Sequence, residues 1–432
     1  MISCKLHLFC ATLCALSLAI ACPARADEDV PQPLDMKTAI RIAKNKSQAV
    51  ASARAMAQSS RLLGDAEGRL PDPEVMAEAW QVPVERPLAL RDASMVSVGI
   101  RQSFPAPGVL SSRTEAREAD ARVYDAALVD RARTVERDTA HAFVDLQVAS
   151  ARHAAHAAHR DVASQLVTLA RARMSAAGGR LTDLTQAQAE QARLEADVTL
   201  EAAMIDRARA KLNGLLRRPM GAPLVTAPLS EAETVTVDEA HAAALAETHR
   251  PEIASARMRR AASEANARAA SSEASLPTFS VGAAWYAPTT LMPFHGYGVS
   301  VGATIPWLWG SARTRERAAT TQATAEAENA GEIANQARVE AASALTEVRA
   351  RQRHLLVLTK SAKPASDAAF EASLAAYQAG QGDASAVLRM QKDVSEVDVA
   401  VVEARAALAH ALADLDWAVG TDVPHVPLGG GQ

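Results

Sequence analysis

The sequence predicts a mainly α-helical fold with a small β part, dominated by long coiled-coil helices, and three observations predict it. Hydrophobic residues make up 49% but aromatic residues only 3%, so alanine, the best helix former, carries much of the apolar share. Two runs of about 70 residues pass with hardly a helix-breaking residue and would form helices about 100 Å long. Short segments ahead of these runs alternate apolar and polar residues with the period of two that is typical of strands.

The first 26 residues have the features of a secretory signal peptide. Lys5 gives a positive start, residues 6–21 form an apolar run, and Ala24-Arg25-Ala26 offers small residues for cleavage before Asp27. All four cysteines lie in this segment. A chain cut after Ala26 therefore has no disulfide, thiol nucleophile or cysteine-based metal site.

A second interpretation of this segment concerns Cys22. The stretch Leu18-Ala19-Ile20-Ala21-Cys22 resembles a bacterial lipobox, in which cleavage before the cysteine leaves it as the lipid-bearing first residue. Cys22 is thus either a lipidation site or a spare cysteine of an ordinary signal peptide. Beyond the signal, no stretch reaches the 18 or so uncharged apolar residues of a spanning helix, so a membrane crossing would have to use strands.

The remaining chain is a tandem repeat with halves at 27–230 and 231–420, followed by a predicted flexible tail at 421–432. Each half runs through an opening helix, two strands, a very long helix, a glycine turn and a returning helix. Proline ends both opening helices, at Leu70-Pro71 and Leu276-Pro277. We expect strands at about 74–82, 94–104, 278–286 and 297–305, and long helices at 108–177, 183–217, 309–378 and 384–418, with Pro364 intruding in the third.

The strand segments have the pattern of a sheet with two different faces. Between residues 94 and 104, Val96, Val98 and Ile100 alternate with small or polar residues, and the length suits a tilted membrane strand. Most aromatic residues of the chain lie in or beside the four segments, as in the girdles of outer-membrane barrels. The alternative is a small soluble sheet with an aromatic core, but four short strands could not bury so many rings alone.

The returning helices carry a heptad pattern. From Val387 apolar residues step by three and four, and the same steps begin 203 residues earlier at Leu184. A sustained heptad predicts a supercoiled seam against partner helices. Gln191 and Glu201 break the first seam, so the two hairpins are expected to pack differently.

These patterns together predict an assembly of several copies. Four strands cannot close a barrel in a membrane, because open edges leave backbone groups unsatisfied in lipid. Three copies would supply twelve strands, an even number in the observed range, whereas the eight strands of a dimer would leave a much narrower lumen. The long helices carry too many charges for lipid and must project into water. The expected architecture is a β-barrel shared between protomers and continued by an α-helical barrel.

The order of motifs resembles the TolC-like outer-membrane efflux family over essentially the whole chain after the signal. The matching motifs are Arg250-Pro251-Glu252 in the second opening helix, the strand exits at 104–108 and 305–310, and the helix turns at 178–184 and 377–380. Each motif is weak alone, and their order and double occurrence carry the resemblance. Gln102-Ser103-Phe104-Pro105 resembles most closely the heavy-metal (cobalt–zinc–cadmium) resistance branch.

The resemblance implies a homotrimer with a 12-stranded barrel in outer-membrane lipid and a helical barrel in the periplasm. It implies two partners, a periplasmic adaptor (a membrane fusion protein) and an inner-membrane pump of the resistance–nodulation–division class. The duct itself would conduct passively, with heavy-metal cations as cargo in that branch. The alternatives are a duct for drug efflux or type I protein secretion and, more remotely, a periplasmic coiled-coil scaffold that never enters a membrane.

The sequence offers no sign of chemistry. It contains no nucleotide loop, Ser/His/Asp order or zinc signature, so we expect no enzyme activity, no cofactor and no bound metal. The net charge of −4 argues against a nucleic-acid partner.

The helix turns supply the candidate site residues, since the family resemblance makes them the periplasmic tips. Asp183 matches an acidic position that lines the family's entrance, Tyr377 matches a tyrosine that helps hold it shut, and Gly380 lies in the second turn. Three copies of Asp183 would form an acidic ring, which favours cations in channels. Asp183 could instead be a helix N-cap with Gln186 as capping partner, and Tyr377 could simply pack the last helical turn.

Overall fold

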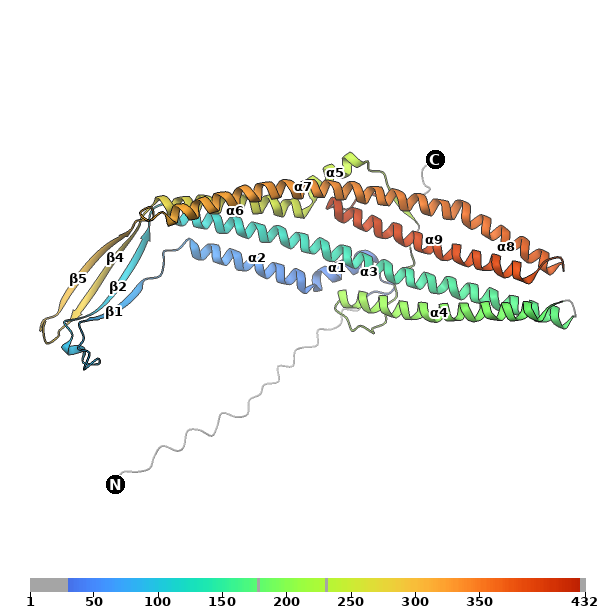
Figure 1. The fold of residues 1–432 in the computed structure, drawn as a ribbon, viewed down its shortest axis with the longest axis horizontal. Coiled ribbons are helices and arrows are strands. Elements are labelled where there is room, and N and C mark those ends of the chain that lie inside the picture. The colour runs from blue at the N-terminus through green and yellow to red at the C-terminus, as the bar shows by residue number, and fades with distance from the viewer. Residues whose placement is uncertain (1–29, 177–178, 230–231, 428–432) are drawn as a thin grey trace, which may run out of the picture.

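The structure, a computed structural model, describes residues 30–176, 179–229 and 232–427. The predicted signal peptide and Cys22 lie outside these ranges. Within them, none of the helices combines the length and the apolar character that a membrane-crossing helix needs. The chain is mainly helical with a small sheet, which confirms the predicted fold class. Figure 1 shows a long, gently curved molecule with the sheet at one end and two helical hairpins at the other.

The two halves contain corresponding helices, and two helices of the second half together correspond to the longest helix of the first. Each half opens with a helix capped by an aspartate, because the side chain of Asp35 accepts a hydrogen bond from the backbone N–H of Thr38 and that of Asp238 from His241. The first half has α1 (Met36–Lys46), α2 (Gln48–Glu67), α3 (Val109–Ser175) and α4 (Leu181–Leu215). The second has α5 (Glu239–His249), α6 (Pro251–Ser275), α7 (Ser311–Val357), α8 (Lys363–Gln378) and α9 (Ala384–Val419).

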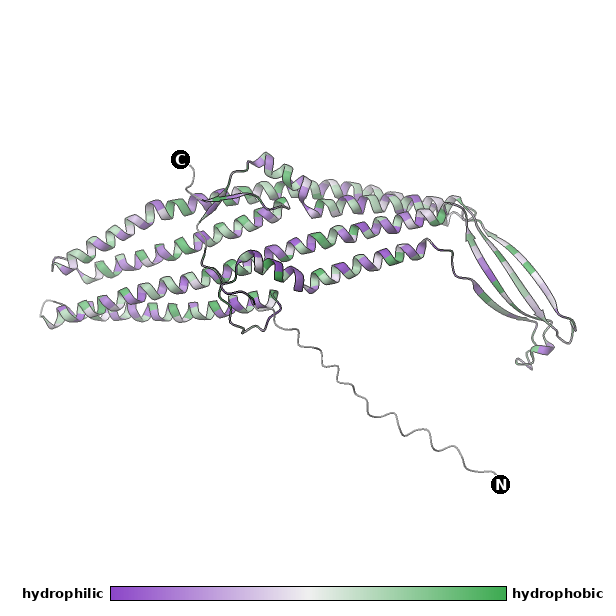
Figure 2. Ribbon diagram, turned by 180° about the vertical axis from the view of Figure 1, so that it is seen from behind, coloured by the Kyte–Doolittle hydropathy of each residue, from purple (hydrophilic) through white to green (hydrophobic). Residues whose placement is uncertain are grey.

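The helices form a layer that runs the length of the molecule. Near the sheet the helices in contact follow the order α2, α3, α6 and α7, and towards the hairpin tips the order is α4, α3, α9 and α8. Helix α3 takes part in both sets. In Figure 2 hydrophilic and hydrophobic colours alternate along the helices without a long uninterrupted hydrophobic stretch, as expected for helices in contact with water on part of their surface.

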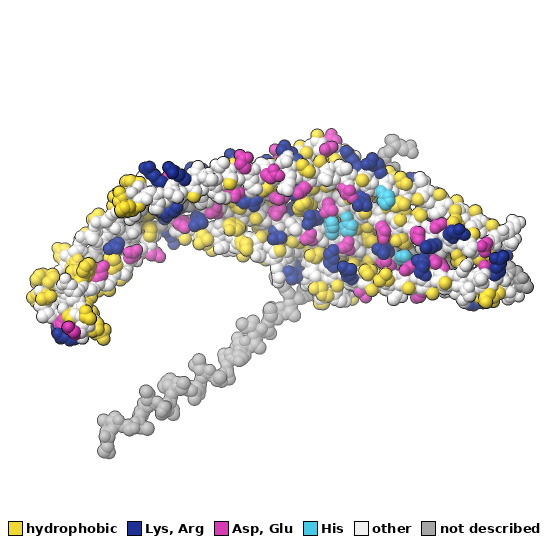
Figure 3. Space-filling model, in the orientation of Figure 1, with side chains coloured by type: hydrophobic (Ala, Val, Ile, Leu, Met, Phe, Trp, Pro, Cys, Tyr) yellow, Lys and Arg dark blue, Asp and Glu magenta, His cyan; other side chains and the backbone are white. Residues whose placement is uncertain are grey.

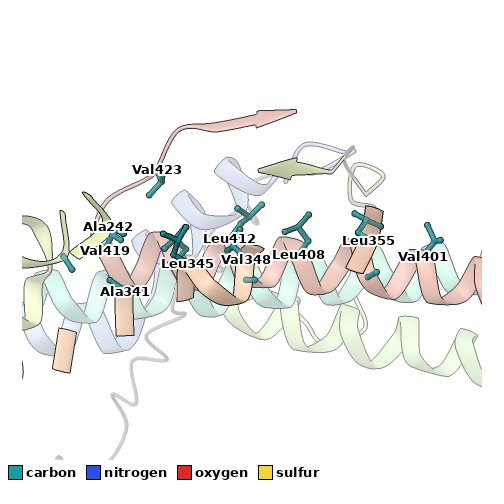
Figure 4. Packing of buried hydrophobic residues seen from close by; sticks show 14 residues of the cluster. Ala242, Ala341, Leu345, Val348, Leu355, Val401, Leu408, Leu412, Val419 and Val423 are labelled. Atoms are coloured by element: carbon teal, nitrogen blue, oxygen red, sulfur yellow. The ribbon is translucent and has the colours of Figure 1, made fainter. Parts of the chain in front are cut away.

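Each half has its own apolar core at the level of its short opening helix. In the first half, Leu34 and α1 pack on Phe143 of α3 and Leu212 of α4. In the second half, α5 packs on α7 and α9 around Leu345, Leu408 and other residues drawn in Figure 4. The short helices α1 and α5 thus cover one face of the layer. The apolar contacts of the two buried clusters hold them there.

The long helix expected over 309–378, into which Pro364 intrudes, is divided into two helices in the structure. A π-helical turn, η2 (Leu358–Ala362), separates α7 from α8, and the N–H of Lys363 bonds the carbonyl of Leu358, five residues back. Pro364 explains the break, because proline has no N–H and its ring collides with the carbonyl four residues earlier in a regular helix. The wider π turn accommodates it.

Four antiparallel strands form the sheet in the order β1, β2, β4 and β5. They are β1 (Glu74–Trp80), β2 (Met95–Pro105), β4 (Thr278–Ala287) and β5 (Gly296–Thr304), with a short 3₁₀ helix, η1 (Leu90–Asp92), between β1 and β2. The two hairpins come from different halves of the chain and meet where β2 pairs with β4.

The segment expected to be a flexible tail differs from that expectation in its described part. Residues His425–Pro427 form β6, which pairs antiparallel with β3 (Glu233–Val235) in the connection between the two halves. Charged contacts of His425 to α9 and β3, described below, hold this strand. Such contacts between distant residues are not visible in local composition.

Candidate functional site

One face of the four-stranded sheet is apolar and exposed. Residues paired across the strands share a face, and one such row joins Val75, Ile100, Ala283 and Val299. Val75 of β1 and Val299 of β5 keep 76% and 71% of their surface exposed. A contiguous exposed apolar surface marks contact with a membrane or a partner. The same face also carries Ala77, Val98, Phe104, Phe279, Val281, Trp285, Tyr297 and Val301.

The opposite face is polar and built from small side chains. One row there joins Glu74, Arg101, Gly282 and Ser300, and the Arg101 guanidinium lies 3.9 Å from the Glu74 carboxylate. Small inward residues let a sheet bend sharply. In Figure 3 charged side chains of both signs are spread over the helical part and are sparse on the sheet.

Both edges of this sheet are open in the described chain. Strand β1 pairs only with β2, and β5 only with β4. The outer edges therefore present unpaired backbone N–H and C=O groups, which need a further strand, a covering segment or water. A single copy is thus an incomplete sheet with one apolar face.

At the far end of the molecule, Arg173 joins the two helical hairpins. Its guanidinium, near the end of α3, donates a hydrogen bond of 2.6 Å to the backbone carbonyl of Tyr377 in α8 and lies 4.3 Å from the centroid of the Tyr377 ring. Arg173 is not among the residues predicted from the sequence. The one feature of the sequence that could have indicated Arg173 is its position close to the first helix turn, from which a cation could reach the second hairpin.

Tyr377 is almost completely buried, in a cluster with Leu166, Ala384 and Val387. Its hydroxyl has no hydrogen-bond partner among the described residues. Burial raises the pKa of Tyr377, Arg173 opposes this, and the nearby Asp183 carboxylate adds to it. Tyr377 thus packs the last turn of α8, as expected, and it lies at the hairpin tips in contact with Arg173.

We expect Tyr377→Phe to leave stability unchanged or slightly higher, because it removes a buried hydroxyl that makes no hydrogen bond to any of the described residues. The matched variant Tyr377→Ala removes the ring as well and should cost about 3–5 kcal/mol, as for other large-to-small core changes. Thermal unfolding followed by circular dichroism measures both. A Phe variant as unstable as the Ala variant would show that the hydroxyl is bonded in the assembled protein.

Asp183 lies inside the first turn of α4, so the alternative that it caps this helix is wrong. The N-cap is Arg180, and the helix begins at Leu181, two residues before Asp183. The carboxylate is nearly buried in the single copy, at 9% exposure. A negative charge in a first turn interacts favourably with the helix dipole.

Gly380 ends α8 in a conformation that favours glycine. Its φ is +82°, its N–H bonds the carbonyl of Tyr377 at 3.1 Å, and the N–H of Gln381 bonds Ala376 at 3.0 Å. This pair of bonds is the Schellman motif, in which a left-handed residue closes the helix. The structure brings Gly380 next to Arg173 and Tyr377, at the turn of the second hairpin.

Glu201, expected to break the first helical seam, is instead paired inside it. Its carboxylate is buried and lies 2.5 Å from the guanidinium of Arg152 in α3, which also reaches Glu403 of α9 at 3.3 Å. Arg152 is not among the residues predicted from the sequence. Arg152 lies 23 residues before the last residue of α3 and Glu201 lies 20 residues after the first residue of α4, and this similar spacing could have revealed the pair.

Comparison with known proteins shows similarity in structure. No family model matches the chain, and no curated protein matches it. Among solved structures it is similar to the outer-membrane channel OprN, with a TM-score of 0.71 and 20% identity over 89% of each chain. It is also similar to CusC, described for its transmembrane channel formation, with a TM-score of 0.76 and 16% identity over 89% of this chain and 92% of that one.

A third similar structure is the outer membrane protein VceC from Vibrio cholerae, with a TM-score of 0.73 and 17% identity over 89% of this chain and 96% of that one. All three comparisons cover about nine tenths of this chain. The chain therefore has the fold of the TolC-like outer-membrane channels OprN, CusC and VceC.

Proposed function

We propose that this chain is one protomer of a trimeric outer-membrane channel that conducts substrate passively. The observation that carries the proposal is the sheet, which has one exposed apolar face, one polar face and two open edges. Lipid suits the apolar face, and only closure of the edges satisfies the backbone in lipid. Pairing β5 of one copy with β1 of the next in a ring of three gives twelve strands and a polar lumen.

The helices extend this conduit into water. Helix α3 has 67 residues and is therefore about 100 Å long. Its surface and that of its neighbours carry charges of both signs, as in the pairs of Arg160 with Asp161 and Arg193 with Glu190. Three such layers side by side would wall a periplasmic tube continuous with the barrel.

Purified protein in detergent tests the assembly directly. Light scattering should give the mass of three chains, and the protein should form conducting pores in planar lipid bilayers. A monomer, or a trimer that never conducts, would reject the proposal. The N-terminal peptide mass from the same sample distinguishes cleavage after Ala26 from lipidation at Cys22.

We further propose that the channel works with a periplasmic adaptor and an inner-membrane pump, with heavy-metal cations as cargo. The support is the fold together with the resemblance at residues 102–105. Deleting the gene and measuring tolerance to zinc, cobalt, cadmium, copper and several drugs tests the cargo. Unchanged tolerance to every metal rejects metal transport, and loss of drug tolerance alone would indicate a drug-efflux duct.

We expect Asp183→Asn to weaken the cation preference of reconstituted channels, because three copies of this carboxylate would form a negative ring at the tip. The reversal potential under a salt gradient measures the preference. Asp161→Asn, an exposed acid of α3 paired with Arg160, is the matched control and should leave it unchanged. If the Asp183 variant and the wild-type channel had equal cation selectivity, the proposed acidic ring would be rejected.

A further inference from the structure

Residues 421–427, which follow α9, fold back onto the molecule as a short strap. Helix α9 stops at Gly420, whose φ of +77° turns the chain, and β6 then pairs with β3. The backbone N–H of Val423 donates to the Asp416 carboxylate at 2.8 Å, and Figure 4 shows Val423 above the core of the second half. Three paired residues hold little by themselves, so the side chains decide whether the strap stays in place.

His425 of the strap lies between two carboxylates. Its Nδ1 forms a hydrogen bond of 3.2 Å with Glu233 of β3, and its Nε2 lies 3.4 Å from the Asp416 carboxylate of α9, an ion contact without hydrogen-bond geometry. A neutral imidazole has a single N–H, and only the protonated ring can donate from both nitrogens. A neutral ring would turn a bare lone pair towards one of the two carboxylates. The geometry therefore fits an imidazolium that bridges β3 and α9.

The surrounding charges agree with this reading. The Asp416 carboxylate close to Nε2 raises the pKa of His425 against the effect of burial, and the negative charge of Glu233 raises it further. The other acid of the strap, Asp422, is paired with Arg133 of α3 at 3.1 Å. Arg133 also contacts Glu136 at 3.3 Å, so its charge is shared among carboxylates.

The strap also forms part of a cavity wall. A cavity of about 980 Å³ lies between α1, α3 and α9, with Phe143 and Leu408 among its lining residues. Lys37 and Arg41 of α1 also line it, and the strap contributes Asp422, Val423 and His425. The volume is at the upper end of the range for small-molecule sites. Movement of the strap would change access to this space.

We propose that His425 is a proton-operated latch, which holds the strap on β3 and α9 and keeps one wall of the cavity in place while the imidazole is charged. Loss of the proton removes the positive charge that attracts both carboxylates and releases the strap. The sign follows from linkage. A raised pKa in the folded state means that the stabilisation is fully present below the ordinary imidazole value of about 6.5 and is lost as the pH rises through the folded value.

Hydrogen exchange measured by mass spectrometry on the full-length protein in detergent tests the latch between pH 6 and pH 9. After correction for the intrinsic pH dependence of exchange, amides of residues 421–427 should lose protection as the pH rises. His425→Gln should exchange fast at every pH. His425→Arg should stay protected throughout, because guanidinium remains charged and donates from several nitrogens.

Two further variants make the outcome decisive. Glu233→Gln removes one carboxylate and should move the midpoint of release to lower pH, because it withdraws a negative charge from the ring. His241→Gln, an exposed histidine of α5, should follow the wild type. Wild-type protection that does not change between pH 6 and pH 9, or an unshifted midpoint in Glu233→Gln, would overturn the proposal.

Discussion

Arg152→Ala is expected to destabilise the helical part of the protein by about 3–5 kcal/mol, because it leaves a buried carboxylate without its partner. Glu201 is 2% exposed and lies 2.5 Å from the Arg152 guanidinium. An uncompensated charge in such a place costs far more than the pair contributes. Thermal unfolding followed by far-ultraviolet circular dichroism measures the loss of helix.

Two variants separate the buried charge from a general effect of losing an arginine. Arg160→Ala removes a cation of the same helix whose partners, Asp161 and Glu195, are largely exposed, and should cost at most about 1 kcal/mol. The double variant Arg152→Met/Glu201→Leu replaces the pair by apolar side chains and should recover most of the stability. If Arg152→Ala were as mild as Arg160→Ala, the carboxylate of Glu201 would have to be hydrated.

Val299→Lys is expected to abolish or strongly reduce insertion of the proposed channel into the outer membrane. Val299 lies at the middle of β5 on the exposed apolar face, and a lysine facing the bilayer midplane costs about 2–4 kcal/mol. The cost is repeated in every copy of the assembly. Cell fractionation, together with the yield of assembled trimer on gels run without heating, measures the effect.

The neighbouring residue is the matched control, because successive residues of a strand point to opposite faces. Ser300 belongs to the polar face, in the row with Gly282 and Arg101. Ser300→Lys should therefore assemble normally and alter only the conduction of ions. Equal tolerance of both lysines would mean that the apolar face does not meet lipid.

The sequence pattern predicted the fold because its strongest signals are periodic. Alternation at Val96, Val98 and Ile100 reports which face of a strand is apolar, and the heptads report which side of a helix is packed. The four-stranded sheet and the long helices follow from these local signals. The resemblance at the level of the fold is confirmed by the similar solved structures.

The contacts at the candidate site could not be predicted in the same way. The packing of Arg173 against Tyr377 and the pairing of Arg152 with Glu201 join residues of different helices, and no periodicity connects them. The first residue of a helix is set by backbone geometry. The sequence pattern therefore could not show that Asp183 lies within the first turn of α4 and not at its N-cap. The substrate, which depends on such details, stays a proposal.

The π turn ahead of Pro364 gives the two hairpins of one copy different mechanics. Helix α3 runs as one rod from Val109 to Ser175, whereas the rod made by α7 and α8 has a joint at Leu358–Ala362. A ring of three copies would then alternate continuous helices with jointed ones. Widening of this ring at its hairpin end would bend only the jointed helices, one in each copy, so the opening would become triangular and not circular.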